Sequence, residues 1–161
     1  MSAATGPAGA LLLAAGLAAN GLGTGIMLAT VIGVAPYQGV QSYREYVSGV
    51  RFMWPRFDPA MPLLNITALL AYLVHAVVLD ESATARFGFA TSSALLLCTV
   101  GISVTKNLPV NRYVASLDPA HQPVDWADRD PRRRWRRWNV VRTGSALTAF
   151  VVAVLTTALA G

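Results

Sequence analysis

The residues best suited to chemistry lie toward the C-terminal end, where arginines and tryptophans lead into an apolar segment. Trp135, Trp138, Asn139 and Arg142 are spaced i, i+3, i+4 and i+7, so on an α-helix they share one face. A cation one turn inside a membrane helix is normally paired, extended to the interface or used in function. Arg142 is therefore the leading candidate for a site, and it suits a carboxylate, phenolate or enolate.

The arginines just before this face also have an ordinary explanation. A basic and aromatic membrane anchor accounts for residues 132–137. Such an anchor does not require an amide at Asn139 or a guanidinium at Arg142. The sequence therefore divides these cations into anchors, which are the majority, and one candidate for substrate contact.

Two asparagines precede this face along the chain. Asn107 and Asn111 flank Pro109 after the third apolar segment, and the proline is expected to disrupt regular helix there. Their amides could bond freed backbone groups or donate to a ligand at the mouth of a helix bundle. The two roles are compatible, so both residues are candidate site residues.

A segment of aromatic and ionic residues, 36–60, supplies further candidates. Its tyrosines and tryptophan are typical of an interfacial belt. Partial desolvation would raise the pKa of Glu45 and suit it to acid or base chemistry beside Tyr43. A salt bridge from Arg44 or Arg51 to Glu45 is an equally good explanation.

Several polar residues lie within or next to the apolar segments. Asn20 and Asn65 place amides at membrane depth, where they pack between helices or line a polar cavity. We count both, with Tyr43 and Asp58, among the candidate substrate contacts. His75 stands alone in its segment, which indicates a structural role and gives no metal-ligand spacing.

The elements that must position these residues follow from composition. Hydrophobic residues make up 54% of the 161 residues and charged residues 13%, which is unusual for a soluble domain. A hydrocarbon core needs roughly 20 apolar residues per helical crossing. We therefore predict an all-α integral membrane four-helix bundle, a single domain over residues 1–161, with a retained first helix. The expected helices are 8–35, 61–79, 87–105 and 140–160, joined by longer loops at 36–60 and 106–139.

The distribution of the thirteen Lys and Arg residues indicates the orientation. Nearly all lie in the two longer loops or at the start of the last helix, and only Arg86 lies on the other side. We expect a multi-pass protein of the cell membrane, with both termini and the Asp80-Glu81 turn outside and both longer loops cytoplasmic. With a net charge of +5, the basic segment is expected to contact anionic lipid headgroups, and no nucleic-acid partner is expected.

The single cysteine, Cys98, excludes a disulfide or a Cys-x-x-Cys redox pair within the chain. This separates the chain from four-helix quinone reductases that depend on cysteine pairs. No metal site is predicted.

Two motifs resemble those of the anthrone-oxygenase-like family of small four-helix membrane proteins. One is an Asn-x-Pro-x-Asn element, here 107–111, and the other is a Trp-rich segment ending in arginine, here 135–142. The resemblance covers nearly the whole chain and implies a four-helix membrane fold. Characterised relatives are similar to oxygenases that convert anthrones to anthraquinones in aromatic polyketide pathways of natural product biosynthesis.

The resemblance implies a reaction that needs no bound cofactor, with dioxygen as co-substrate. A base removes a proton from a ring carbon, amide and guanidinium donors hold the enolate, and the carbanion reduces dioxygen. The anion would be held by Arg142, Asn107, Asn111 and Asn139. Trp135 and Trp138 would stack on a planar lipophilic substrate. The base stays open among Glu45, Asp58 and His121.

Other classes of function fit the same residues. A membrane-embedded cyclase or isomerase could use the polar mouth without consuming dioxygen, and a noncatalytic membrane subunit would need no site. A proton-coupled transporter is disfavoured because none of the four apolar segments contains a carboxylate. A homo-oligomer is compatible with the sequence, which does not identify the substrate.

Overall fold

The computed structural model describes residues 6–79 and 82–160, and its regular elements there are all helical. This confirms the predicted all-α class. Four helical runs are long and apolar enough to cross a membrane: Pro7–Val40, Ala60–Leu79, Ala83–Ser116 and Trp126–Leu159. The turn at Asp80 and Glu81, expected to face outward, lies outside the described residues.

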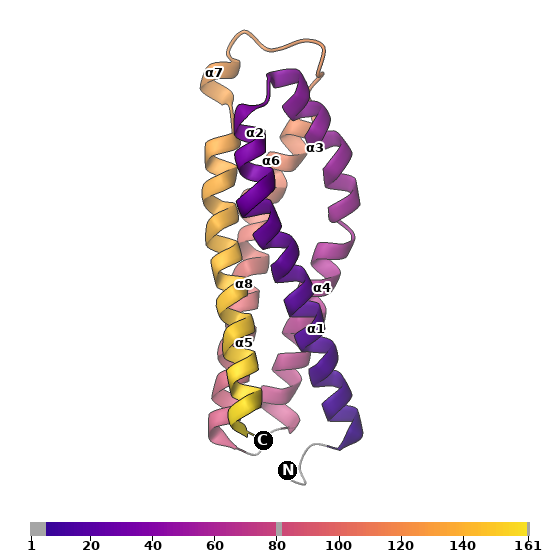
Figure 1. The fold of residues 1–161 in the computed structure, drawn as a ribbon, viewed down its shortest axis with the longest axis vertical. Helices are drawn as coiled ribbons and strands as arrows, with labels where there is room; N and C mark the ends of the chain where they lie inside the picture. Colours follow the sequence, from indigo (N-terminus) through magenta and orange to yellow (C-terminus); the bar gives the residue numbers. More distant parts are fainter. Residues whose placement is uncertain (1–5, 80–81, 161) are drawn as a thin grey trace.

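Each run is built from one or more helical elements (Figure 1). The first comprises α1 (Pro7–Ala29), the π-helical turn η1 (Thr30–Val34) and α2 (Ala35–Val40). The second comprises α4 (Ala60–Val74) and η2 (His75–Leu79). The third comprises α5 (Ala83–Ile102), η3 (Ser103–Asn107) and α6 (Leu108–Ser116). The last comprises the short α7 (Trp126–Arg129) and the long α8 (Arg132–Ala160).

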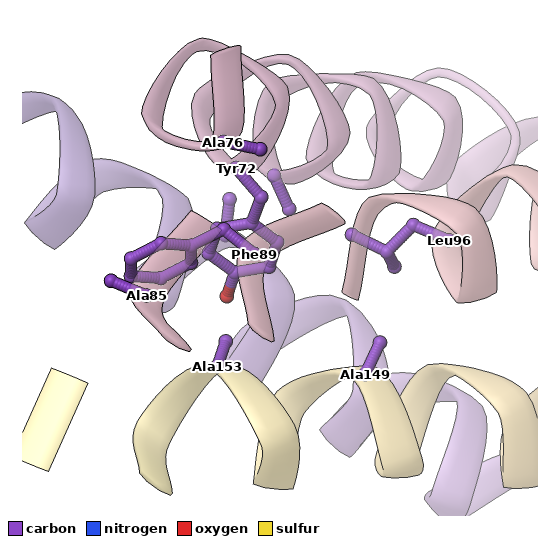
Figure 2. Close-up of a cluster of buried hydrophobic side chains, with 9 residues drawn as sticks. Tyr72, Ala76, Ala85, Phe89, Leu96, Ala149 and Ala153 are labelled. Carbon is purple, nitrogen blue, oxygen red and sulfur yellow. The ribbon is translucent and has the colours of Figure 1, made fainter. Parts of the chain in front are cut away.

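The lower part of the bundle in Figure 1 packs α1, α4, α5 and α8 through small side chains. Tyr72 and Phe89 fill the middle, with ring centroids 5.9 Å apart. Figure 2 shows Ala153 of α8 beside these rings and Ala149 opposite Leu96. Small residues let membrane helices approach closely. A Cβ added at Gly16 would lie only 2.7 Å from Ala71 Cβ. Helix α1 therefore packs closely on α4 at Gly16.

The segment 36–60, expected to be a loop, is largely helical. Helix α3 (Tyr43–Phe57) is capped at its N-terminus by Ser42. The Ser42 hydroxyl accepts from the Glu45 backbone amide, and the Glu45 carboxylate accepts from the Ser42 backbone amide. This capping box starts a helix that buries Tyr43, Tyr46, Val47 and Val50 on one face. The expectation of a loop was wrong because the aromatic and ionic composition concealed an amphipathic helix.

The segment 106–139 is also more helical than expected. Helix α6 continues from α5 through Pro109, and α8 begins at Arg132 rather than near Val140. The predicted break at Pro109 was wrong. The proline follows directly on the wider π-helical turn η3, in which the Leu108 N–H bonds to Ser103 O five residues earlier. The missing N–H of Pro109 therefore falls where the hydrogen bonding changes from π-helical to α-helical spacing.

The bundle is consequently longer than the hydrocarbon core of a membrane is thick. At 29 residues, α8 is about 43 Å long, against a hydrocarbon core of about 30 Å. We call the upper part, formed by α2, α3, α6, α7 and the start of α8, the extension. It has its own core, in which Tyr43 and Trp126 pack with ring centroids 4.8 Å apart.

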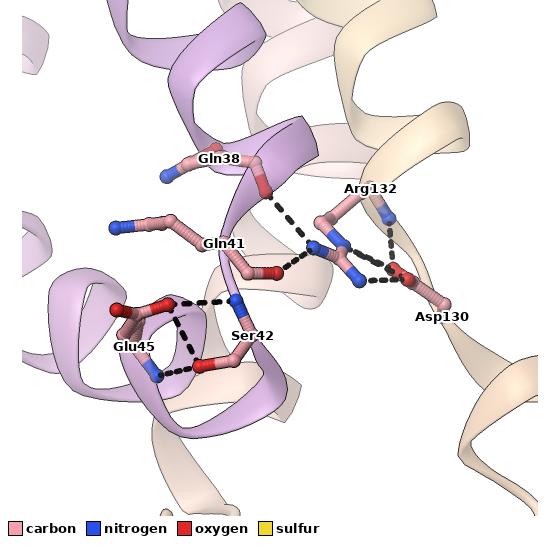
Figure 3. A network of polar contacts seen from close by, with 6 residues as sticks. All are labelled: Gln38, Gln41, Ser42, Glu45, Asp130 and Arg132. Atoms are coloured by element: carbon pink, nitrogen blue, oxygen red, sulfur yellow. Dashed lines mark hydrogen bonds and ion pairs between the residues drawn. The ribbon is translucent and has the colours of Figure 1, made fainter.

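Arg132 ties the corner between α2 and α3 to α8 (Figure 3). Its Nη1 donates to the backbone oxygens of Gln38 and Gln41 at 2.9 and 2.8 Å, and its Nη2 lies 2.6 Å from Asp130. These bonds hold the top of the extension together. Arg132 is therefore a structural residue and is not confined to membrane anchoring.

Candidate functional site

Arg142 lies on α8 where the extension meets the apolar part of the bundle. It is 18 residues before Ala160, or about 27 Å along the helix, which places it near one edge of a hydrocarbon core that ends at the other end of α8. Its side chain is half-buried. A cation at this depth has to be satisfied by hydrogen bonds or by a ligand.

The partners of Arg142 are all neutral. Its Nε donates to Asn139 Oδ1 at 3.0 Å and its Nη1 donates to Ser103 Oγ at 3.2 Å. A guanidinium has five N–H groups, so these bonds leave three without an acceptor among residues 6–79 and 82–160. Among the ion pairs of the described residues, none includes Arg142. The site therefore holds a positive charge with unused donors.

A second row of polar groups fixes Asn139. Its Nδ2 donates to Thr30 Oγ1 of η1 at 2.9 Å, and the Thr30 hydroxyl in turn donates to the Met27 carbonyl at 2.7 Å. Asn139 is fully buried. The amide oxygen of Asn139 is thereby turned toward Arg142, so Asn139 positions the guanidinium and does not line a cavity.

Two hollows meet at Arg142. The first, which we call the aromatic hollow, opens between α1, α3 and α8 and encloses about 630 Å³ including its mouth. Its apolar walls include Met27, Met53, Trp54 and Phe57, and its polar groups include Gln38, Tyr46, Asn111, Trp135 and Arg142. A concave, mostly apolar lining with a few polar groups is typical of a small-molecule site.

The second, which we call the amide hollow, lies between α4, η3 and α6. Its polar lining consists of Asp58, Asn65, Ser103, Asn107, Asn111 and Arg142. Arg142, Asn111 and Met61 line both hollows. The junction of the two therefore carries a guanidinium and an amide.

The amides flanking Pro109 differ in their use. Asn111 is half-buried and makes no side-chain hydrogen bond to another described residue, which leaves its amide free for a ligand. Asn107 is 1% exposed and donates from Nδ2 to the Trp135 carbonyl at 3.3 Å. The structure thus brings Asn107 and Asn111, near the end of helix three, together with Arg142, near the start of the apolar part of helix four.

The two tryptophans predicted on one face of α8 occupy different environments. Trp135 is buried and lines the aromatic hollow. Trp138 is half-buried outside the lining of both hollows, and the Lys106 ammonium lies 5.3 Å from its ring centroid. Trp138 fits the role of an interfacial aromatic residue.

The three residues considered for the base lie in different places. Glu45 is exposed, lines neither hollow, and has its pKa lowered by the hydroxyl and backbone donors of Ser42. His121 is exposed and pairs with Asp118 at 2.6 Å. Asp58 lines the amide hollow and accepts from Trp54 Nε1 at 3.1 Å. Glu45 has no ion pair with Arg44 or Arg51 among the described residues.

The other candidate contacts are accounted for by packing. The Tyr43 hydroxyl donates to the Asp118 carbonyl at 2.9 Å, and burial followed by the Asp118 charge raises its pKa. Asn20 donates to the Tyr72 hydroxyl at 3.3 Å and accepts from Thr24. Neither residue lines either hollow.

Asn65 and His75 complete the predicted set. Asn65 lines the amide hollow, but its Nδ2 donates to Met61 O one turn earlier at 2.8 Å. His75 is buried with Nε2 3.2 Å from Gly9 O, and its ring centroid lies 5.2 Å from that of Phe89. This packing agrees with the structural role expected for His75.

Sequence reasoning missed four polar residues of the site. Thr30 and Ser103 fix Asn139 and Arg142, and Gln38 and Tyr46 line the aromatic hollow. Burial and then Asp130 raise the pKa of Tyr46, so its phenol stays neutral. The spacing of Tyr43, Tyr46, Val47 and Val50 after a Ser-x-x-Glu capping box was a signal for Tyr46. Nothing in the sequence marked Ser103.

These features define the class of protein: a helical bundle with four helices able to span a membrane and a half-buried cation at the junction of two hollows. A family model described as anthrone oxygenase matches residues 51–152, well over half of the chain. The chain belongs to the anthrone oxygenase family. Comparison with curated proteins and with solved structures gave no match. The matched span includes Asp58, Asn107, Asn111, Trp135 and Arg142.

Proposed function

We propose that the protein is a membrane-embedded oxygenase that oxidises a lipophilic anthrone-type substrate with dioxygen and without a bound cofactor. The observation that carries the proposal is the unpaired Arg142 guanidinium, which has free N–H groups at the junction of two hollows. Membership of the anthrone oxygenase family supports the same chemistry.

The reaction converts a ring CH₂ opposite a ketone into a second ketone. A base removes one proton from that carbon, and the charge moves to the ketone oxygen to give an enolate. The enolate passes one electron to dioxygen, and the resulting radical pair joins carbon to oxygen as a hydroperoxide. Loss of the second proton with cleavage of the O–O bond gives the quinone and one water, so one dioxygen is consumed per product.

Arg142 and Asn111 are assigned to the enolate oxygen. A charged donor in a partly buried site stabilises developing negative charge more than it does in water. Asn139 and Ser103 act as positioning residues, because they bond the guanidinium and orient it. Trp135 and Trp54 offer aromatic faces to a planar ring system in the aromatic hollow.

Asp58 is assigned as the base. Among the described residues, Asp58 is the one carboxylate in the lining of the two hollows, and it lies in the amide hollow with Arg142 and Asn111. A carboxylate near, but not paired with, the guanidinium can take a proton from carbon while the cation holds the oxygen. Glu45 and His121 are replaced in this role by Asp58.

We also propose a place for the protein in the cell. The extension carries most of the arginines, which favours the cytoplasmic side of the cell membrane and contact with anionic headgroups. Both hollows then lie near the inner membrane surface. A lipophilic substrate dissolved in the bilayer would reach the site without crossing water.

The test is dioxygen uptake by the purified protein in lipid nanodiscs with anthrone, measured with an oxygen electrode while quinone is followed by absorbance. Uptake above the no-protein rate, unaffected by a chelator and matched one to one by quinone, supports the proposal. Anthrone left unchanged, or isomerised without oxygen uptake, contradicts it and points to an isomerase or to a noncatalytic subunit.

A further inference from the structure

The last turn of α3 connects the two hollows through one pair of residues. Trp54 lines the aromatic hollow, and Asp58, four residues later, lines the amide hollow. The indole Nε1 of Trp54 donates to Asp58 Oδ1 at 3.1 Å, and the Asp58 backbone N–H donates to Trp54 O at 2.9 Å. A hydrogen bond between side chains therefore joins a wall of one hollow to a wall of the other.

The backbone around Asp58 has little freedom. The segment that carries the chain from α3 into α4, along one side of the bundle in Figure 1, contains Pro55, Pro59 and Pro62. A proline ring fixes the φ angle of its own residue, which limits the paths that the backbone can take. Asp58 has φ −60° and ψ −41°, so the backbone keeps helical angles at the end of α3. The freedom that remains to Asp58 is mainly the rotation of its side chain.

The bond from Trp54 distinguishes the two carboxylate oxygens. Within residues 6–79 and 82–160, the Trp54 indole is the one hydrogen-bond partner of the Asp58 side chain, and it occupies Oδ1. Oδ2 is left free to accept a proton. Because Asp58 is exposed, its carboxylate would turn among several rotamers without this bond. A base must stand within hydrogen-bond reach of the proton that it removes, so this restraint matters for the reaction.

We propose that Trp54 is a positioning residue for the base Asp58, and that it holds Oδ1 so that Oδ2 takes the proton from the ring carbon. The inference rests on the proposed function, in which Asp58 is the base. When the C–H bond breaks, the proton goes to Oδ2 and the electron pair moves to the enolate oxygen of the substrate. The Trp54 ring is also part of the aromatic wall. A planar substrate packed on this ring therefore lies next to the base that the same side chain holds.

Anaerobic deuterium exchange isolates the proton-transfer step. Anthrone is incubated with the protein in nanodiscs in deuterated buffer without dioxygen, and deuterium in the ring CH₂ is measured by mass spectrometry against the no-protein rate. Trp54→Phe keeps an aromatic face but removes the N–H. At saturating anthrone it should lower the exchange rate by about 10-fold, which is part of the roughly 10²- to 10⁴-fold that a general base supplies. The KM for anthrone should stay nearly unchanged in Trp54→Phe and rise in Trp54→Leu, which loses the aromatic face as well.

A double-mutant cycle separates positioning from folding. In an Asp58→Asn background the base is absent, so adding Trp54→Phe should lower the exchange rate no further. Trp138→Phe is the matched control, because Trp138 lies outside the lining of both hollows and its loss should leave exchange unchanged. A merely structural bond at the end of α3 predicts a lower unfolding temperature with the same exchange rate per folded molecule.

Three results overturn the inference. They are an unchanged exchange rate in Trp54→Phe, an equal loss from Trp54→Phe with and without Asp58, and exchange by the unmodified protein at the no-protein rate. Dioxygen uptake in air tests the oxygenase function separately. Exchange that depends on Trp54 and Asp58 but is not followed by uptake supports the positioning role and contradicts the oxygenase function. Uptake together with exchange that Trp54→Phe leaves undiminished supports the oxygenase function and contradicts the positioning role.

Discussion

Replacing Arg142 by leucine should lower activity strongly while leaving stability nearly unchanged or raising it. Two hydrogen bonds are lost, to Asn139 and Ser103. Ser103 keeps its bond to Thr99 O at 2.8 Å. The Thr30 hydroxyl lies 3.4 Å from Asn139 Oδ1 and can turn toward it from the Met27 carbonyl, which keeps the Thr30 backbone N–H as a donor. The leucine also removes an unpaired cation that is costly to bury. We expect the free energy of unfolding to change by no more than about 1 kcal/mol in the unfavourable direction.

The expected loss of activity is far larger. Removing one donor that stabilises an oxyanion typically lowers kcat by about 10² to 10³-fold. Oxygen uptake and quinone formation should fall by this factor in Arg142→Leu, measured per folded molecule. Thermal unfolding in the same nanodiscs gives the stability.

Arg86→Leu is a contrasting control at the other end of the bundle. The Nε of Arg86 donates to Ala76 O at 3.0 Å, and Arg86 lines neither hollow. Its loss should lower stability and leave activity per folded molecule unchanged. An Arg142→Leu protein that unfolds at a much lower temperature, yet turns over anthrone normally, would refute the assignment of Arg142 to substrate.

Three further predictions follow from individual contacts. Asp58→Asn should lower kcat by about 100-fold or more through loss of the base, whereas Glu45→Gln should leave it unchanged; equal effects on steady-state turnover would exclude Asp58. Gly16→Val should lower the unfolding temperature, because even a Cβ there lies 2.7 Å from Ala71 Cβ; an unchanged melting curve would contradict the packing of α1 on α4. Ser42 donors lower the pKa of Glu45, so its stabilising effect is full above the ordinary value of about 4.3 and is lost as pH falls through the lowered folded pKa. The stability difference between the unmodified protein and Glu45→Ala should therefore shrink in acid, and a constant difference would refute the role of the cap.

The sequence was sufficient for the apolar helices and for the face of α8 that carries Asn139 and Arg142. Both depend on local periodicity, which a single chain displays directly. The grouping of Asn107, Asn111 and Arg142 could also be predicted. Consecutive membrane helices are antiparallel, so the C-terminal end of helix three and the N-terminal end of helix four lie on the same side of the membrane. These parts of the fold need no knowledge of distant contacts.

The remaining parts depend on features that hydropathy does not show. Helix α3 was hidden because its polar face and aromatic residues resembled an interfacial loop, although Ser42 and Glu45 gave a capping signal. The π-helical turn η3 joins α5 to α6 just before Pro109, and hydropathy gave no sign of it. The bond from Thr30 to Asn139 joins residues 109 positions apart, which sequence spacing cannot reveal.

Dioxygen uptake with anthrone tests the central claim most directly. Purified protein in nanodiscs, with a chelator present, should consume one dioxygen for each quinone formed, and Arg142→Leu should reduce both rates together. Consumption at the no-protein rate, or an undiminished rate in the Arg142 variant, would contradict the proposal that this guanidinium holds the enolate for oxidation.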